Sequence, residues 1–191
     1  MKQIKQDTSY FYDGVKVADL GAAEITSWLN SSEYNVAVHN VEGSKYYQEQ
    51  DIDLVWLHYK DDNFRIHETV ATTLEIKADT YDSPNFFLEV ISNDNKNTLG
   101  CFLQTKSDYL YYYFINKKIL YAIPTKEAQD WYYNKVDNGH KFKYTSVPTK
   151  DKRGRVLYRN KGALVNIKQM MKEVDILEYD LNPFFNNQLP A

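Results

Sequence analysis

The sequence predicts an α/β or α+β fold in a single domain, and three observations support this prediction. Short apolar runs rich in β-branched and aromatic residues alternate with segments whose apolar residues recur at helical spacing. A chain of 191 residues is long enough for one sizeable core and too short for two. No internal repeat or low-complexity linker divides it, so residues 1–191 are interpreted as one domain.

The N-terminal half is expected to begin with a helix and continue with strands. Residues 18–29 have apolar side chains at helical spacing, and the polar run at 30–32 ends the pattern. A turn is expected at 61–63, followed by an extended segment at 65–69. Four further segments read as strands: 34–39, 51–57, 73–78 and 86–92.

The C-terminal half is expected to combine a hairpin with helices and two more strands. The tyrosine-rich run 109–115 and the run 119–123 predict a hairpin around 116–118. The other expected elements are a short helix at 98–108, a helix at 126–135 with Thr125 as N-cap, strands at 141–146 and 155–159, a helix at 164–174 and an aromatic tail at 182–191.

Composition and motifs exclude several classes of protein. No run approaches the roughly 18 apolar residues of a membrane span, and no apolar region follows the lysines near Met1, so a secretory signal is not expected. A single cysteine, Cys101, agrees with a reducing cytoplasm and is interpreted as a packed small residue. The four histidines lack zinc-site spacing, and neither a phosphate-binding P-loop nor a Gly-x-Ser-x-Gly elbow occurs.

Asp53, Glu75 and Lys77 are the most informative residues, because each is a charged residue inside an apolar strand pattern. Side chains alternate along a strand, so Glu75 and Lys77 share one face while Leu74 and Ile76 share the other. Charges on such a face are costly unless they have partners. Two carboxylates suit a hard divalent cation such as Mg²⁺, and a neighbouring ammonium suits a water nucleophile or developing phosphate charge.

These three residues and their spacing resemble the motif of the PD-(D/E)XK nuclease superfamily. In that superfamily a helix precedes a strand near the acid, a second strand carries (D/E)-x-K, and a third strand and a helix follow. The resemblance covers about residues 15–124, which would form a restriction-endonuclease-like core with a central mixed β-sheet flanked by helices. Residues 125–191 would then be a basic C-terminal extension. One departure is that Ile52, and not proline, precedes Asp53.

The resemblance implies a Mg²⁺- or Mn²⁺-dependent endonuclease that hydrolyses DNA phosphodiester bonds. Asp53, Glu75 and the main-chain carbonyl of Ile76 would bind the cation, and Lys77 would orient or activate water, with its pKa lowered by a cation or by desolvation. A plainer interpretation is a structural salt-bridge network in a non-catalytic module of the same fold that binds nucleic acid or protein. An RNA-cleaving relative is a further alternative.

Three more residues are possible members of the site. Family members place an additional acid on the first helix, where Glu24 lies, although a solvated glutamate fits equally. Glu89 interrupts an apolar strand and would be either an acid close to the metal site or one partner of a cross-strand salt bridge. Gln104 lies on the expected helix after the third strand, where relatives contact phosphate.

Charge is distributed unevenly along the chain. Residues 49–94 contain eleven acidic against three basic residues, a local charge of about −8, and residues 138–172 contain ten basic against one acidic, about +9. The basic segment is expected to hold the backbone of DNA, giving affinity with little sequence readout. Its candidate residues are Lys141, Lys143, Lys150, Lys152, Arg153, Arg155, Arg159 and Lys161. Relatives that dimerise across a duplex make a homodimer a further expectation.

Overall fold

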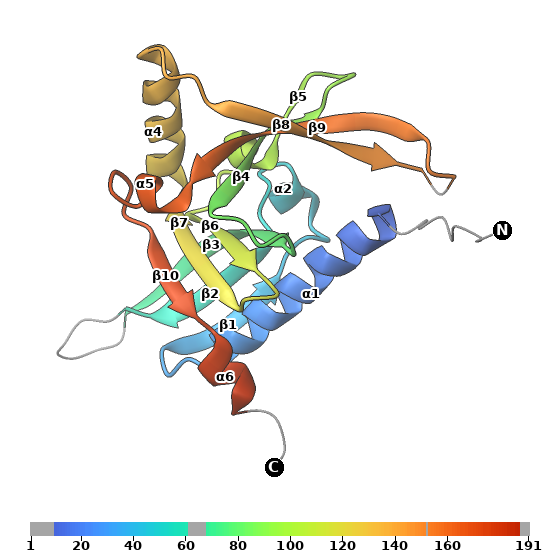
Figure 1. Ribbon diagram of the computed structural model, residues 1–191. Coiled ribbons are helices and arrows are strands. Elements are labelled where there is room, and N and C mark those ends of the chain that lie inside the picture. The colour runs from blue at the N-terminus through green and yellow to red at the C-terminus, as the bar shows by residue number, and fades with distance from the viewer. Residues whose placement is uncertain (1–9, 61–67, 152, 188–191) are drawn as a thin grey trace.

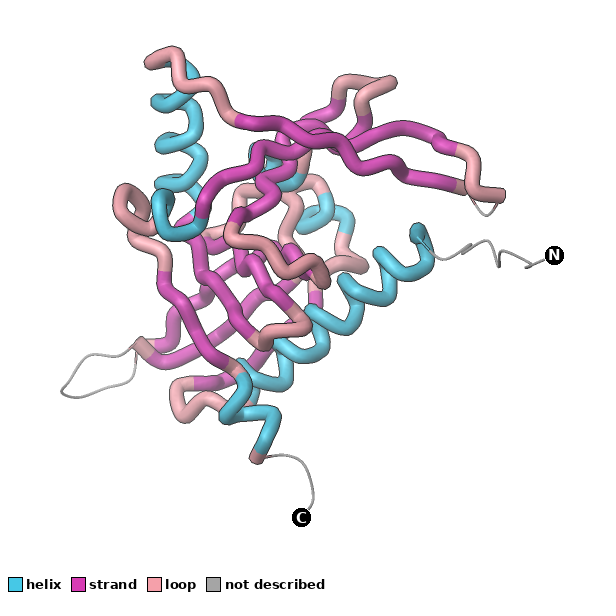
Figure 2. Tube along the Cα trace, in the orientation of Figure 1, coloured by secondary structure: helices cyan, strands magenta, loops and turns pink. Residues whose placement is uncertain are grey.

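The computed structural model describes residues 10–60, 68–151 and 153–187, with side chains described from residue 16 onward. Figures 1 and 2 show two β-sheets and several helices, with helix α1 (Tyr10–Asn30) running beneath the larger sheet. The mixed α+β class with a mixed central sheet is therefore confirmed. The turn expected at 61–63 and residues 65–67 lie outside the described residues.

The larger sheet, sheet A, has the strand order β1-β2-β3-β6-β7-β10. Strand β3 pairs antiparallel with β2 and parallel with β6, and the remaining pairs are antiparallel. The bounds are β1 (Asn35–Asn40), β2 (Leu54–Tyr59), β3 (Thr69–Asp79), β6 (Tyr109–Phe114), β7 (Ile119–Pro124) and β10 (Leu177–Asp180). The expected hairpin is the β6–β7 pair.

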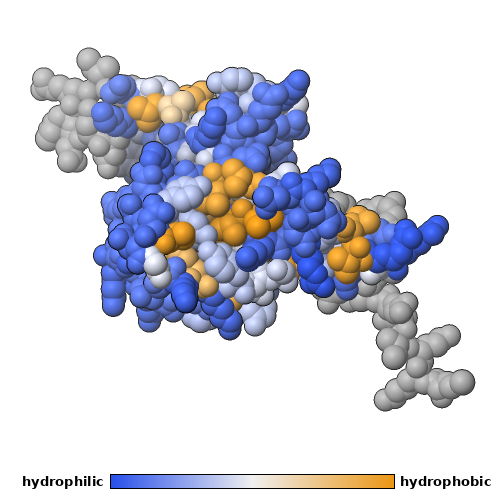
Figure 3. Space-filling view, turned by 90° about the horizontal axis from the view of Figure 1, so that it is seen from above, coloured by the Kyte–Doolittle hydropathy of each residue, from blue (hydrophilic) through white to orange (hydrophobic). Residues whose placement is uncertain are grey.

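The smaller sheet, sheet B, has the order β5-β4-β9-β8 with antiparallel pairs. Its bounds are β4 (Asn85–Asn93), β5 (Thr98–Leu99), β8 (Lys143–Lys150) and β9 (Val156–Asn166). Strands β8 and β9 form a long hairpin that projects above the N-terminal half of α1 in Figure 1, and we call this β8–β9 hairpin the arm. The surface seen from above is mostly hydrophilic and carries a few hydrophobic patches (Figure 3). The third strand expected from the sequence, β4, therefore belongs to the second sheet and is not a hydrogen-bonded neighbour of β3.

Short helices connect the strands, and one longer helix packs at the end of sheet A. The bounds are α2 (Lys45–Gln48), α3 (Cys101–Gln104), α4 (Thr125–Asp137), α5 (Ile167–Met170) and α6 (Asn182–Asn186). The predicted helix at 126–135 is confirmed as α4, but Thr125 is its first helical residue, and the Thr125 hydroxyl is buried 3.1 Å from that of Ser107. The predicted helix at 98–108 is confirmed over only four residues.

The helix predicted at 164–174 is largely wrong. Leu164 and Val165 extend β9, where Val165 pairs with Phe86 of β4 and is buried. Only Ile167–Met170 are helical. The run of apolar residues suits a buried strand as well as a helix, and pairing with β4 decides between them.

Two hydrophobic cores lie on opposite faces of sheet A. Leu74 and Ile76 of β3 pack with Ile25 and Leu29 of α1 in the α1-side core. The inter-sheet core lies between sheets A and B and includes Leu110 and Tyr112 of β6 and Phe86, Leu88 and Val90 of β4. Because Glu75 and Lys77 pair with Leu110 and Tyr112, their side chains project toward sheet B.

Candidate active site

Asp53 is fixed at the start of β2 by a break in the β2–β3 ladder. The last ladder pair is Leu54 with Leu74, and the amide of Asp53 donates to the carbonyl of Leu74 at 2.9 Å. Two residues further along β3, the amide of Ile76 donates to Asp53 Oδ2 at 2.8 Å. The Asp53 carboxylate thus accepts a hydrogen bond from the main-chain amide of Ile76 beyond the end of the β2–β3 ladder. This hydrogen bond places the carboxylate beside Glu75.

The carboxyl groups of Asp53 and Glu75 meet in a partly buried position. Glu75 is only 8 % exposed, and burial together with the charges of Asp53 and Asp51 raises its pKa to about 10. Burial also raises the pKa of Asp53, to about 6, while hydrogen bonds from the Ile76 amide and from Glu75 lower it. A hydrogen bond between the two carboxyl groups favours one shared proton, so the two side chains titrate as a pair.

Lys77 lies two residues beyond Glu75 on the same face of β3. Its Nζ is 3.9 Å from Glu89 Oε2 and 5.8 Å from the centroid of the Phe87 ring. Burial acts to lower the pKa of Lys77, but Cys101, Glu89 and other acidic neighbours outweigh burial and raise it. The expected lowering is therefore wrong for the metal-free chain, because the acids around the ammonium favour its charged form.

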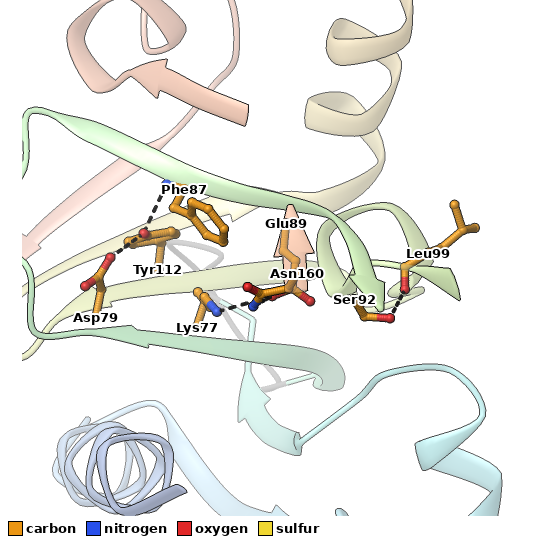
Figure 4. A network of polar contacts seen from close by, with 8 residues as sticks. All are labelled: Lys77, Asp79, Phe87, Glu89, Ser92, Leu99, Tyr112 and Asn160. Carbon is orange, nitrogen blue, oxygen red and sulfur yellow. Dashed lines mark hydrogen bonds and ion pairs between the residues drawn. The ribbon is translucent and has the colours of Figure 1, made fainter. Parts of the chain in front are cut away.

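Glu89 comes to this cluster from sheet B and connects it to the arm (Figure 4). Asn160 of β9 donates from Nδ2 to Glu89 Oε2 at 2.7 Å, and the same carboxylate pairs with Lys77. The salt bridge expected for Glu89 is present, although it joins two sheets instead of neighbouring strands, and the same carboxylate lines a cleft together with Glu75.

Asp51 is a member of the cluster that the sequence reasoning missed. It lies just before Asp53, has a left-handed backbone with φ of 49°, and its carbonyl accepts from Thr105 Oγ1 at 2.6 Å. Burial and the charge of Glu89 raise its pKa. The available signal was the Asp-x-Asp spacing, which would place two acids on one side of an extended segment, although Asp51 itself is not extended.

Glu75, Lys77 and Glu89 line a cleft of about 610 Å³ between α1, β3, β4 and α3, whereas Asp51 and Asp53 are not among its described lining residues. The walls also include Val17 and Ala18 of α1. Cys101 also lines the cleft, and burial raises the pKa of its thiol, which agrees with the interpretation of Cys101 as a packed side chain and not a nucleophile.

One of the possible additional residues lies away from this cluster. Glu24 is on the α1 side of sheet A, where its carboxylate accepts from Tyr113 Oη at 2.6 Å and pairs with Lys118 Nζ at 2.6 Å. The structure therefore does not bring Glu24 to Asp53 and Glu75. Gln104 ends α3 with an exposed side chain. The sequence predicts an amphipathic helix, but it does not show which face of the sheet that helix covers. The residues that Glu24 contacts could therefore not be predicted.

The candidate DNA-binding residues are spread over both faces of the arm and its ends. Lys143 pairs with Leu164 on the face that also carries Val147 and Asn160, whereas Arg159 and Lys161 pair with Pro148 and Ser146 on the opposite face. Arg155 at the tip is paired with Asp151 at 2.7 Å. Lys141 precedes β8 and is exposed, Lys150 ends that strand, Arg153 is exposed at the tip, and Lys152 lies outside the described residues.

No group of three or more His, Cys, Asp or Glu side chains that could hold a metal ion occurs in the described parts of the chain. The same residues include no helix that is long and apolar enough to cross a membrane. No family model, curated protein or solved structure matches the chain.

Proposed function

We propose that this chain is a Mg²⁺- or Mn²⁺-dependent nuclease with a restriction-endonuclease-like core that acts on DNA. The single observation that carries the proposal is the meeting of the Asp53 and Glu75 carboxyl groups, with Lys77 on the same strand face. The order of elements also fits: helix α1 comes first, the acid opens β2, and Glu-x-Lys lies on the central strand β3. The position of β4 in the second sheet departs from the simple family pattern.

The residues present fit a divalent cation. Two acids whose pKa values are raised chiefly by burial hold a proton in the metal-free chain, and a cation that replaces this proton offsets the repulsion between the carboxylates. Asp53 and Glu75 would supply the side-chain ligands, with the Ile76 carbonyl as a third oxygen. Only two carboxylates and waters are needed for Mg²⁺, which retains several waters in most sites.

When bound, the cation would polarise the scissile phosphate and lower the pKa of water. Lys77 contributes a fixed positive charge, held by Glu89, which would offset charge that develops on the phosphate. Its raised pKa means that this ammonium stays protonated at neutral pH, so Lys77 would orient water and stabilise charge without acting as a general base.

The experiment that tests the proposal is cleavage of plasmid DNA and of labelled oligonucleotides with Mg²⁺, with Mn²⁺ and with EDTA. Wild-type protein should cut only with a divalent cation. Glu75→Gln, which removes one ligand charge at nearly constant volume, and Lys77→Met should each reduce the rate by about 100-fold or more. Glu33→Gln is the matched control because Glu33 is exposed on the loop before β1.

Full activity in Glu75→Gln would overturn the nuclease assignment. The alternative is a non-catalytic module that uses the same residues as an ion-pair network, and the Lys77–Glu89 pair is the observation that favours it. That module would bind nucleic acid or protein without cutting and would be indifferent to Mg²⁺. Parallel assays on RNA of the same sequence test the RNA-cleaving alternative.

A further inference from the structure

A second cleft of about 620 Å³ adjoins the candidate active site. The two clefts share Lys77, Ala78 and Asp79 of β3, so whatever occupies the second cleft lies next to Lys77. Its other walls come from the loop before β4, from β4, and from the arm. The volume is within the range of roughly 300–1,000 Å³ that is typical of small-ligand sites.

Apolar and polar side chains share the lining of this second cleft, and one of the apolar side chains is an aromatic ring. Phe87 of β4 pairs with Leu164 of β9, and Val147 of β8 lies on the same face of sheet B, so these three side chains form an apolar strip along one side of the cleft. Gly162 makes room for that ring, since a Cβ on Gly162 would lie only 2.4 Å from Phe87 Cε2. An aromatic ring bordered by aliphatic side chains gives an apolar surface on which a planar base can pack without regard to its identity.

The charged residues that line the second cleft disfavour a phosphate group. Asp79 and Asp82 are acidic, and Lys77 is the one basic residue among the lining residues described. Lys77 itself is already paired with Glu89. An anionic group would be repelled by the acids, so the occupant that fits is neutral, while its attached phosphate would lie at the neighbouring active site.

Asn160 offers a polar contact beside the apolar strip of this cleft. Its Nδ2 donates to Glu89, whereas its Oδ1 is buried and has no hydrogen-bond partner among the described residues. An unpaired buried amide oxygen costs about 1–3 kcal/mol, so an N–H donor supplied by a ligand would be stabilised there. Every nucleobase carries such a donor on the edge that is engaged in a base pair.

We propose that the second cleft binds an unpaired nucleobase of the strand that is cut. A base packed against this apolar strip must be free of its neighbours in a double helix, and its N–H donors reach an acceptor only when they are not paired with a second strand. Asn160 would then connect base binding, through Glu89, to the position of Lys77. This inference rests on the proposed function and narrows the substrate to single-stranded or unpaired nucleic acid.

The test measures binding in EDTA, so that no strand is cut. Fluorescein-labelled oligodeoxynucleotides of about 12 nucleotides are compared as single strand, as duplex and as single strand with abasic sites. Wild-type protein should bind the single strand at least about tenfold more tightly than either of the other two probes.

Adjacent residues of β8 supply matched variants. Val147→Asp adds a negative charge at the cleft wall, and Ser146→Asp adds the same charge one residue away on the opposite face of the strand. Both positions are exposed, so both variants should fold, as thermal melts will show. Val147→Asp should weaken single-strand binding about tenfold, and Ser146→Asp less than about twofold.

The possible failures are distinguishable. Single-strand preference with a selective loss in Val147→Asp, but no cleavage with any cation, supports the base subsite and overturns the nuclease. Cation-dependent cleavage with equal affinity for duplex and single strand supports the nuclease and overturns the subsite. Equal losses of affinity in the two variants would also overturn the base subsite, because the nucleic acid would not then be bound specifically at the cleft. The absence of any binding would overturn it as well.

Discussion

Glu89 Oε2 lies 3.9 Å from Lys77 Nζ, and these two residues belong to different β-sheets. The charged end of the candidate catalytic lysine is thus held by a strand that is not hydrogen-bonded to its own. Phe87 on the same strand places its ring beneath the ammonium. The relative position of the two sheets therefore sets the position of Lys77.

Replacing Glu89 by Gln tests this role. The variant keeps an oxygen that accepts from Asn160 and removes the negative charge that holds Lys77. We expect the kcat of DNA cleavage to fall about tenfold with little change in KM, because Lys77 loses its orientation while substrate contacts remain. Steady-state cleavage kinetics measure both parameters.

Glu24→Gln is the matched control for this experiment. It also removes the anion of a glutamate–lysine pair, but that pair lies on the α1 side of sheet A. Cleavage should be unchanged at a temperature where the variant is folded. Equal losses of kcat in both variants would show that the Glu89 effect is a general loss of stability.

The stability of the metal-free protein should decrease as pH rises above about 4. The folded pKa of Glu75 is raised to about 10 and that of Asp53 to about 6, so the folded chain retains protons that the unfolded chain releases. The stability that these two carboxyl groups contribute is fully present at pH values below the ordinary carboxyl pKa. It is lost progressively as the pH rises toward the pKa values of the folded state. Glu75→Gln should therefore raise the melting temperature at pH 8 by about 3 °C or more in EDTA.

Melting curves of wild-type and Glu75→Gln protein between pH 4 and pH 9 would measure this effect. The difference between the two proteins should increase with pH, and Glu33→Gln should follow the wild type. A constant difference across the range would contradict the assigned titration of Glu75.

Magnesium should stabilise the wild-type protein and not the Glu75→Gln variant. A cation that binds only the folded state contributes about 2.7 kcal/mol at a concentration of 100 times its Kd, which corresponds to several degrees in melting temperature. Titration of MgCl₂ into the protein with a constant ionic strength, followed by thermal melts, measures the shift. Equal shifts in both proteins would place the bound cation away from Glu75.

Gly100→Ala should destabilise the fold and reduce cleavage. Gly100 precedes α3, and a Cβ there would lie 2.4 Å from the main-chain carbonyl oxygen of Glu89. Its φ of −82° suits alanine, so the cost is steric: the backbone of β4 must shift, at about 1–3 kcal/mol, and Glu89 shifts with it.

Urea unfolding of Gly100→Ala measures this cost, and Gly43→Ala provides the comparison. A Cβ on Gly43 meets nothing within 4 Å, so that variant should retain wild-type stability and activity. Wild-type stability in Gly100→Ala would show that α3 and β4 are further apart than the structure places them.

Much of the central sheet could be predicted from local sequence. The alternation in residues 73–78 correctly predicts that Glu75 and Lys77 share a face, and the tyrosine-rich hairpin also has a clear pattern. The sheet to which β4 belongs could not be predicted, since Phe86–Ser92 reads the same whether it pairs with β3 or with β9. Pairing between distant strands is decided by packing and not by local propensity.

The same limit explains the outcome for the site. Asp53, Glu75 and Lys77 are recognisable because they interrupt apolar runs, and the structure gathers them. The partner of Lys77 on β4 and the amide of Asn160, 71 residues further along the chain than Glu89, meet only through tertiary folding. Glu24 illustrates the converse, because a plausible position on the first helix does not reveal which face of the sheet the helix covers.

The arrangement of Lys77 and Glu89 has a consequence for how the proposed nuclease would lose its activity. Since the lysine and its anchor meet at the seam between two sheets, a small slippage of one sheet over the other would disperse the cluster while each sheet keeps its hydrogen bonds. Mild denaturant should then inactivate the protein before secondary structure is lost, and the cluster of Lys77 and Glu89 would be the first part of the molecule to lose its native geometry.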